Sequence, residues 1–355
     1  MELPGQTNLF EMVTGSGEPC SHYDRILLES PTPEIMASFV KMFPKIRGYD
    51  DEPAQYENIM VSISGGWDSD IMLDMIERVG YKPGAVKYVF FNTGMEYKAT
   101  LDHLDYLERH YGIKIHRERA AVPVPRGCRE NGVPFLSKQI SSNISRLQKH
   151  GFKWENRPLT DLLQEYPNCK SALRWWCDDW GENSRLNISR RKLLKEFMIK
   201  NPPPMKISDK CCEGAKKRTA TKIAQIIKPD VDLQGVRKAE GGKRSTAYHS
   251  CFSENLDGPD KYRPIFWMKS EDKRAYEEKF QLCHSACYTK YGLDRTGCAC
   301  CPFGKNFERE LAAARIHEPK LFNLANAVFG ESYEYTRKYL KFRKEMEEAD
   351  GADKE

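Results

Sequence analysis

Residues 58–79 show two hydrophobic patterns in succession, and each pattern predicts one kind of element. Residues 58–64 (NIMVSIS) form a short apolar run, which is typical of a buried strand. Residues 69–79 place Ile71, Met72 and Met75 on one helical face, which predicts an amphipathic helix. The same reasoning predicts strands at 86–92, 114–118 and 232–237 and a helix at 98–111. Because strands that alternate with helices are typical of parallel βαβ units, we predict an α/β fold with a doubly wound, mostly parallel sheet.

The flanking segments differ in composition, and they set the predicted domain boundaries. Residues 1–57 are rich in Pro and Gly, so we expect an N-terminal extension with one helix near Pro33 to Phe43. Residues 122–204 are polar and aromatic and end in NPPPM, which predicts a helical insertion. Residues 305–355 are expected to form C-terminal helices and a solvated tail from Glu347. The predicted α/β domain therefore comprises 58–121 and 205–304, with a helix that Ser270 caps and that runs through Phe280.

Composition narrows the function without fixing it. The chain has 355 residues with 56 basic and 51 acidic side chains, and its net charge of +5 permits an anionic substrate or a nucleic acid without requiring one. No stretch approaches the roughly 20 apolar residues of a membrane span. The N-terminus lacks a basic segment followed by an apolar core, so we expect a cytoplasmic protein with no membrane partner. In a reducing compartment the 12 cysteines point to metal, cluster or redox chemistry rather than to disulfides.

The stretch SISGGWDS joins the first predicted strand to the first predicted helix. In open α/β sheets, ligands bind at the carboxyl ends of the strands. Gly65 and Gly66 let the backbone N–H groups turn inward, Ser64 and Ser69 add hydroxyl donors, and the helix N-terminus favours an anion. The spacing is neither GxxxxGK[ST] nor GxGxxG. A glycine turn that simply enters a helix is the alternative interpretation.

This loop resembles the SGGxDS pyrophosphate loop of the adenine nucleotide α-hydrolase superfamily. All five fixed positions of that motif are filled, by Ser64, Gly65, Gly66, Asp68 and Ser69. The resemblance implies a sheet of that superfamily's type and a bound adenine nucleotide, with Mg²⁺ near Asp68. One strand later, Thr93 and Gly94 resemble the D-T-G of its sulfonucleotide reductase branch, although Asn92 replaces the acid.

Four cysteines in two distant segments form the second signal. Cys211 and Cys212 are adjacent, and Cys298 and Cys301 have CxxC spacing. Four thiolates can hold one zinc ion or one [4Fe–4S] cluster, and adjacent cysteines suit zinc poorly. Buried thiols without a ligand are the third alternative. The layout resembles the [4Fe–4S] signature of assimilatory adenylyl-sulfate reductases, which implies that these four cysteines are the cluster ligands.

Basic residues gather near both signals. One group surrounds the Cys-Cys pair, and the other occupies the stretch GVRKAEGGKR; the two groups comprise Lys210, Lys216, Lys217, Arg218, Arg237, Lys238, Lys243 and Arg244. Such cations would hold a phosphosulfate or polyphosphate by charge-assisted bonds, whereas each lysine alone is typical of a solvated surface. Arg237 and Glu240 resemble the G-x-R-x-x-E segment of the reductase branch. We predict Asp68, Arg237 and Lys217 as catalytic residues, and Arg237 and Arg244 as nucleotide ligands.

Other features allow two interpretations each. Trp175 or Trp176 can stack on a base, but aromatic residues on a helix more often pack in a core. Cys283 and Cys287 are spaced by one helical turn, which suits either a second metal or redox pair or simple packing.

From about residue 58 to 304 the chain resembles the phosphoadenosine-phosphosulfate (PAPS) reductase family. Members that reduce sulfonucleotides attack sulfur with a cysteine in an E-C-G-x-H tail, but no cysteine follows Cys301 here. We therefore favour ATP-dependent adenylylation coupled to sulfur transfer, with tRNA or DNA as acceptor and a cysteine desulfurase as sulfur donor. The alternatives are a sulfonucleotide reductase with a relocated cysteine that takes electrons from thioredoxin, and a non-catalytic nucleotide- and cluster-binding module. We also expect residues 64–69 and the four cysteines to line one cavity.

Overall fold

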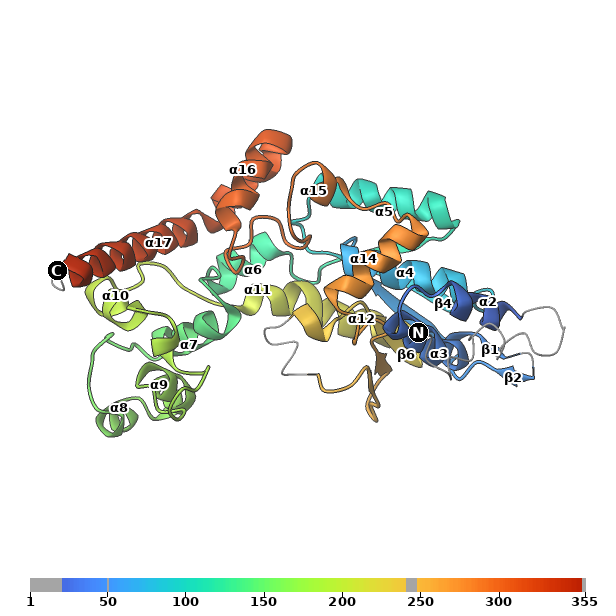
Figure 1. Ribbon diagram of the computed structural model, residues 1–355. Helices are drawn as coiled ribbons and strands as arrows, with labels where there is room; N and C mark the ends of the chain where they lie inside the picture. The colour runs from blue at the N-terminus through green and yellow to red at the C-terminus, as the bar shows by residue number, and fades with distance from the viewer. Residues whose placement is uncertain (1–20, 50, 241–247, 353–355) are drawn as a thin grey trace, which may run out of the picture. The chain divides into compact units, whose positions relative to one another are not determined.

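The computed structural model describes residues 21–49, 51–240 and 248–352 (Figure 1). The chain divides into two compact units, which are considered separately below. Unit 1 contains the described residues of 1–91, 98–118 and 220–297, and unit 2 contains those of 92–97, 119–219 and 298–355. The units group residues by packing, and the predicted domain boundaries stay a prediction.

A six-stranded sheet forms the centre of unit 1, in the order β5-β4-β3-β6-β8-β7. The central strand β3 (Ile59–Ile63) pairs in parallel with β4 (Val86–Asn92) and with β6 (Val231–Gln234). Strand β8 (Asp260–Tyr262) is parallel to β6, whereas β7 (Phe252–Ser253) is antiparallel to β8. The other edge strand is β5 (Ile115–Arg119). The predicted class, α/β with a mostly parallel sheet, is confirmed.

Most helices of unit 1 contribute apolar side chains to buried clusters with this sheet. Helix α4 (Trp67–Val79) follows β3, and its Ile71, Met72 and Met75 belong to the same buried cluster as Val61 of β3. The other helices of this unit are α2 (His22–Glu29), α3 (Pro33–Ile46), α5 (Lys98–Tyr111), α12 (Arg218–Ile227), α14 (Ser270–Phe280) and α15 (Ala286–Thr289). Side chains of α2 and α3 join the same cluster, so the described part of the predicted extension packs into the core. A two-stranded ribbon of β1 (Gly48–Tyr49) and β2 (Glu52–Pro53) follows α3.

Among the predicted element boundaries of unit 1, the end of β6 and the cap of α14 are wrong. Strand β6 ends at Gln234 rather than at Arg237, because the chain at Gly235 passes so close to α4 that a Cβ there would lie 3.1 Å from the Asp68 carbonyl oxygen. The cap of α14 is Lys269, whose N–H donates to the Asp272 carboxylate at 2.8 Å, so Ser270 is the first helical residue.

Unit 2 is mainly helical. Its helices include α6 (Val124–Asn131), α7 (Lys138–Lys149), α8 (Leu159–Glu165), α9 (Lys170–Trp176), α10 (Leu194–Lys200), α11 (Lys210–Cys212), α16 (Phe307–His317) and α17 (Pro319–Ala352). A π-helical turn, Glu213–Lys217, continues α11. Trp175 and Trp176 are buried at 2% and 0% exposure, so the packing interpretation of these residues is confirmed. Helix α17 continues to Ala352, so the expected solvated tail is helical over the described residues, and its Glu347 and Glu348 are exposed.

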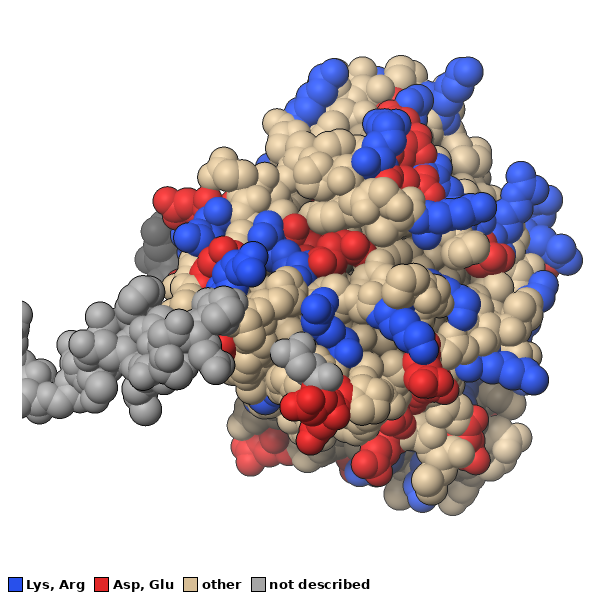
Figure 2. All heavy atoms as spheres, turned by 90° about the vertical axis from the view of Figure 1, so that its right-hand side faces the viewer, with Lys and Arg blue, Asp and Glu red and all other residues tan. Residues whose placement is uncertain are grey.

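Two further observations concern the distribution of charge on the surface and the hydropathy of the helices. On the face shown in Figure 2, Lys and Arg side chains are interspersed with Asp and Glu side chains rather than gathered into one basic field. Within the described part of the chain, no helix combines the length and apolarity that a membrane crossing needs.

Candidate functional site

The glycine loop between β3 and α4 has the shape of an anion seat. Gly65 adopts φ +63°, and a Cβ there would lie 2.8 Å from Cγ2 of Thr100, so the position requires glycine. The Ser64 N–H donates to Oγ of Ser69 at 3.0 Å, which closes the loop on itself. Gly65 and Gly66 are buried, yet their N–H groups have no acceptor among the residues that the structure describes. Buried donors without acceptors at a helix N-terminus are suited to a phosphate.

Asp68, the second residue of α4, lies between two cations. Its Oδ1 is 2.9 Å from Nζ of Lys273 and 3.0 Å from Nε of Arg237. Burial alone would raise the pKa of Asp68, but Lys273 and Arg237 outweigh burial and hold that pKa below its usual value. The structure thus brings the predicted residues Asp68 and Arg237 together, and it adds Lys273, which the sequence motifs did not identify.

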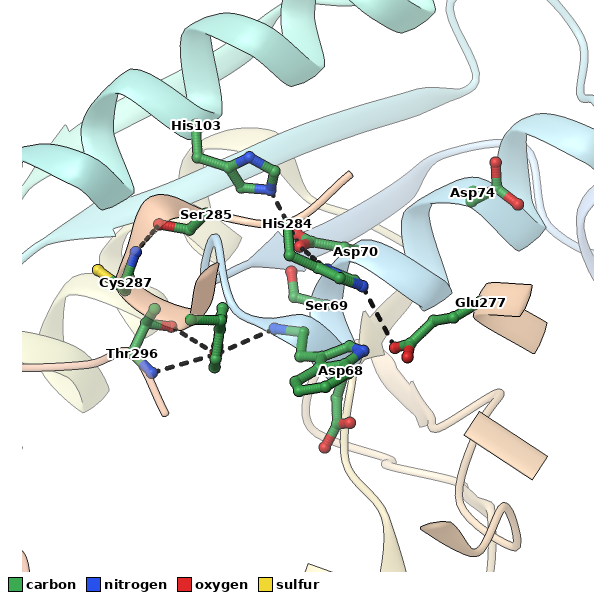
Figure 3. A network of polar contacts seen from close by, with 12 residues as sticks. Asp68, Ser69, Asp70, Asp74, His103, Glu277, His284, Ser285, Cys287 and Thr296 are labelled. Carbon is green, nitrogen blue, oxygen red and sulfur yellow. Dashed lines mark hydrogen bonds and ion pairs between the residues drawn. The ribbon is translucent and has the colours of Figure 1, made fainter. Parts of the chain in front are cut away.

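A buried network lies directly behind the loop (Figure 3). The Asp70 carboxylate is 2.9 Å from Nε2 of His103 and 3.0 Å from Nδ1 of His284. Nε2 of His284 is in turn 3.2 Å from Oε1 of Glu277. Burial would lower the pKa of His284, but its contacts with Asp70 and Glu277 raise it to about 9. His284 therefore carries a positive charge at neutral pH, one turn from the phosphate loop.

Two hydroxyl groups lie against the start of α4. The Trp67 N–H donates to the Tyr288 oxygen at 3.1 Å, and the Thr296 N–H donates to the same oxygen at 3.2 Å. A Cβ at Gly66 would lie 2.6 Å from Oγ1 of Thr296. Sequence reasoning missed Tyr288, Thr296 and the two histidines, because no motif marks them and they meet the loop only in the folded chain.

Thr93 and Gly94, predicted as nucleotide ligands, belong to unit 2. The Thr93 N–H donates to Glu96 at 2.9 Å, and the Thr93 hydroxyl donates to Glu96 at 2.6 Å. The same hydroxyl is 3.4 Å from Sγ of Cys298. The Gly94 N–H donates to Asn92 and to Glu96. Within unit 2 these residues therefore contact one of the predicted cluster thiols, and their nucleotide role stays a prediction.

Unit 2 brings the predicted thiol ligands into one group. Cys211 is hydrogen-bonded to Cys128 and to Cys212. The hydrogen bond with Cys128, burial and the charges of Cys128 and Cys301 raise the pKa of Cys211, and they outweigh the hydrogen bond with Cys212, which lowers it. The hydrogen bond with Cys211 likewise raises the pKa of Cys212. Burial raises the pKa of Cys298, with a smaller contribution from the charge of Cys212. Cys128, on α6, is thus a fifth thiol of this group, outside the predicted ligand set.

No three or more His, Cys, Asp or Glu side chains among the described residues are placed to hold a single metal ion. The thiols influence the pKa values of one another, but they do not converge on one ion position. The metal-ligand assignment therefore stays a prediction. The donor set itself consists of soft thiols from two chain segments, which fits an iron–sulfur cluster.

Lys216 influences two of these thiols. Its charge lowers the pKa of both Cys212 and Cys298, against the larger effects that raise them. Lys217, the predicted catalytic lysine, is an exposed residue at the end of the π-helical turn, and its role stays a prediction. Arg244 lies outside the described residues.

Two further cysteines, Cys287 and Cys300, are buried, whereas Cys283 is exposed. Cys287 is fully buried on α15, and its thiol is 3.6 Å from Oγ1 of Thr100, whereas Cys283 is exposed before that helix begins. Cys300 is buried between the CxxC cysteines, and burial raises its pKa to about 12.

Comparison with known proteins identifies the family of one segment. Residues 58–150 match the model of the phosphoadenosine phosphosulfate reductase domain, which confirms the resemblance over that segment. An uncharacterized protein of Methanocaldococcus jannaschii is 36% identical over 90 residues, which are 25% of this chain and 18% of that relative. The matched part therefore spans less than a fifth of the curated relative.

Two solved structures align over most of the chain at low similarity. Phosphoadenylyl-sulfate reductase from Candida auris, in a phosphate complex, shares 13% identity with a TM-score of 0.36, over 84% of this chain and 97% of that one. The U34-tRNA thiolase NcsA from Methanococcus maripaludis with its [4Fe-4S] cluster shares 12% identity with a TM-score of 0.34, over 91% of this chain and 78% of that one. At these values the two similarities carry no conclusion about the reaction of this chain.

Proposed function

We propose that this protein is an enzyme that binds ATP or an adenylyl sulfonucleotide at the Ser64–Ser69 loop and couples adenylylation of an acceptor to sulfur transfer. The observation that carries the proposal is the pair of buried N–H groups at Gly65 and Gly66 that have no acceptor among the described residues. Arg237 and Lys273 form ion pairs with Asp68, two residues after Gly66. Backbone donors, a helix N-terminus and two cations together suit a pyrophosphate group.

Each residue of the loop has a distinct task in this proposal. The Gly65 and Gly66 N–H groups bind phosphate oxygens, and Ser69 keeps the loop closed. Arg237 and Lys273 offset the negative charge that grows on the pyrophosphate as the α–β phosphate bond breaks. Asp68 positions both cations through its ion pairs. Its carboxylate is already balanced by them, so its surroundings do not favour a direct Mg²⁺ ligand.

The four predicted thiols, Cys211, Cys212, Cys298 and Cys301, would hold a [4Fe–4S] cluster, with zinc as the minor alternative. Such a cluster, when bound, supplies sulfur or electrons to the reaction. Lys216 and Lys138 offset the negative charge of the thiolates, since both lower the pKa of Cys212. We propose a tRNA or DNA acceptor and a cysteine desulfurase as sulfur donor on the resemblance alone.

A second candidate function has one observation in its favour. Cys128 is a thiol outside the predicted ligand set, and it is hydrogen-bonded to Cys211. A sulfonucleotide reductase needs a thiolate that attacks the sulfate sulfur. Cys128 would then be the relocated cysteine, with thioredoxin as the electron donor.

One experiment separates the two functions. Protein purified without oxygen is incubated in parallel with ATP, adenylyl sulfate and phosphoadenylyl sulfate, and pyrophosphate and sulfite are both quantified. Release of pyrophosphate from ATP supports the first function. Release of sulfite that Cys128→Ser abolishes supports the second. Binding of a nucleotide with neither product leaves a non-catalytic module as the interpretation, and failure to bind any of the three contradicts the phosphate-seat assignment.

A further inference from the structure

The Tyr288 hydroxyl occupies a position at the N-terminus of α4 that suits an anion. Its oxygen accepts hydrogen bonds from the Trp67 N–H at 3.1 Å and from the Thr296 N–H at 3.2 Å. Its proton points to Oγ1 of Thr296, which is 3.4 Å away. An oxygen that accepts from the N–H of the first residue of a helix makes a contact that a phosphate oxygen makes there. Burial raises the pKa of Tyr288, so this hydroxyl is neutral.

The Thr296 side chain fills the space next to Gly66 in the same loop. Its Oγ1 would lie only 2.6 Å from a Cβ at Gly66, and the Tyr288 oxygen would lie 3.2 Å from it. The Gly66 side of the seat is therefore filled by side-chain oxygens. A phosphate that approaches Gly66 from this side has to replace one or both of them.

The segment that carries both hydroxyls is fixed at its start and contains glycines later. The Ser285 hydroxyl donates to the Ala99 carbonyl at 3.1 Å, and the Cys287 thiol lies 3.6 Å from Thr100, so α15 is anchored to α5. Gly292 and Gly297 adopt φ +66° and +153°, backbone conformations that glycine reaches at little cost. Tyr288 belongs to the anchored α15, so its hydroxyl can leave the Trp67 N–H only by rotation of its side chain, whereas Thr296 lies between the two glycines.

We propose that the side chains of Tyr288 and Thr296 form a strap that covers the phosphate seat, and that a phosphate oxygen replaces the Tyr288 hydroxyl on the Trp67 N–H. The inference rests on the proposed function, because the displacing ligand is the polyphosphate of a nucleotide. An anion is preferred over a neutral hydroxyl at this position, since Arg237, Lys273 and the helix N-terminus all attract negative charge. The strap thus lowers the apparent affinity by the fraction of molecules in which the seat is covered.

Calorimetric titration of inorganic pyrophosphate and of ATP tests the strap. Tyr288→Phe removes the competing oxygen and keeps the ring, so we expect both ligands to bind about 2- to 10-fold more tightly, the range of one hydrogen bond. Tyr339→Phe is the matched control, because that tyrosine is also buried and donates one hydrogen bond, to the Lys192 carbonyl. Unchanged or weaker binding by Tyr288→Phe would overturn the inference, since Tyr288 would then be a bystander or a direct ligand.

Amide hydrogen exchange at Trp67 in the ligand-free protein supplies a second test that needs no nucleotide. We expect faster exchange in Tyr288→Phe than in the wild type, and no change in Tyr339→Phe. If the wild type binds neither pyrophosphate nor ATP, the proposed function fails. The exchange rate at Trp67 still shows whether the Tyr288 hydroxyl protects the Trp67 N–H. If Tyr288→Phe does not fold, Thr296→Ala replaces it, with about twofold tighter pyrophosphate binding expected. Equal exchange rates in the folded variants would contradict the strap.

Discussion

Nδ1 of His284 lies 3.0 Å from the carboxylate of Asp70, although the two residues are 214 positions apart in the sequence. Asp70 belongs to the first turn of α4, directly after the glycine loop. The contact therefore places a buried cationic ring behind the proposed phosphate seat, and it ties the segment before α15 to the loop.

This contact predicts a pH-dependent stability. The pKa of His284 is raised from 6.5 to about 9, so its contribution is fully present below about pH 6.5 and is lost as pH rises through about 9. The midpoint of thermal unfolding should therefore fall by a few degrees across this window. His284→Gln should be less stable at pH 6.5 and should show a smaller fall towards pH 9. Identical pH profiles for the two proteins would show that the contacts with Asp70 and Glu277 do not raise the pKa of His284.

Gly66→Ala should abolish nucleotide binding. The added Cβ would lie 2.6 Å from Oγ1 of Thr296 and 3.3 Å from Oγ of Ser64, so the loop has to deform. We expect at least a tenfold loss of ATP affinity, because the N–H donors no longer converge. Gly330→Ala is the control, since a Cβ there meets nothing within 4 Å. Equal affinity of both variants would remove the phosphate-seat assignment, while the iron content should not change in either.

Asp68→Asn should weaken both folding and nucleotide binding. The substitution leaves Lys273 and Arg237 without their shared carboxylate, which should cost about 1–3 kcal/mol in the free energy of unfolding. Asp102→Asn is the comparison, because its ion pair with Lys98 is exposed and should contribute about 0–1 kcal/mol. Urea unfolding measures both. A smaller loss for Asp68→Asn than for Asp102→Asn would mean that the buried ion pairs do not stabilise the loop.

Protein purified without oxygen should be brown and contain about four irons per chain, as a [4Fe–4S] cluster requires. Cys212→Ala should bleach it, because one predicted ligand is lost. Cys300→Ala should keep its iron, since Cys300 is fully buried and its thiol lies 3.9 Å from the Tyr97 hydroxyl, outside the predicted ligand set. Colourless wild-type protein with one zinc ion, or full iron in Cys212→Ala, would show that the ligand assignment is wrong.

Local patterns predicted the elements of the sheet well. The strand at 86–92 and the helix at 98–111 match β4 and α5 at both ends, because their apolar spacing reflects local backbone geometry. The end of β6 and the cap of α14 were wrong. Both depend on contacts with other parts of the fold, namely the approach of Gly235 to α4 and the side chain of Asp272.

The order of residues by itself determined the α/β class, the glycine loop and the two cysteine pairs, because each is a short motif whose spacing is set within a few residues. Only the tertiary structure decided what surrounds that loop. Lys273, His284 and Tyr288 come from a segment more than 200 positions later, and hydrogen bonds and ion pairs at such separations leave no periodic signal in a chain. Folding likewise singled out Lys216, rather than its neighbour Lys217, as the cation that acts on Cys212 and Cys298, because a helical turn sends successive side chains in different directions.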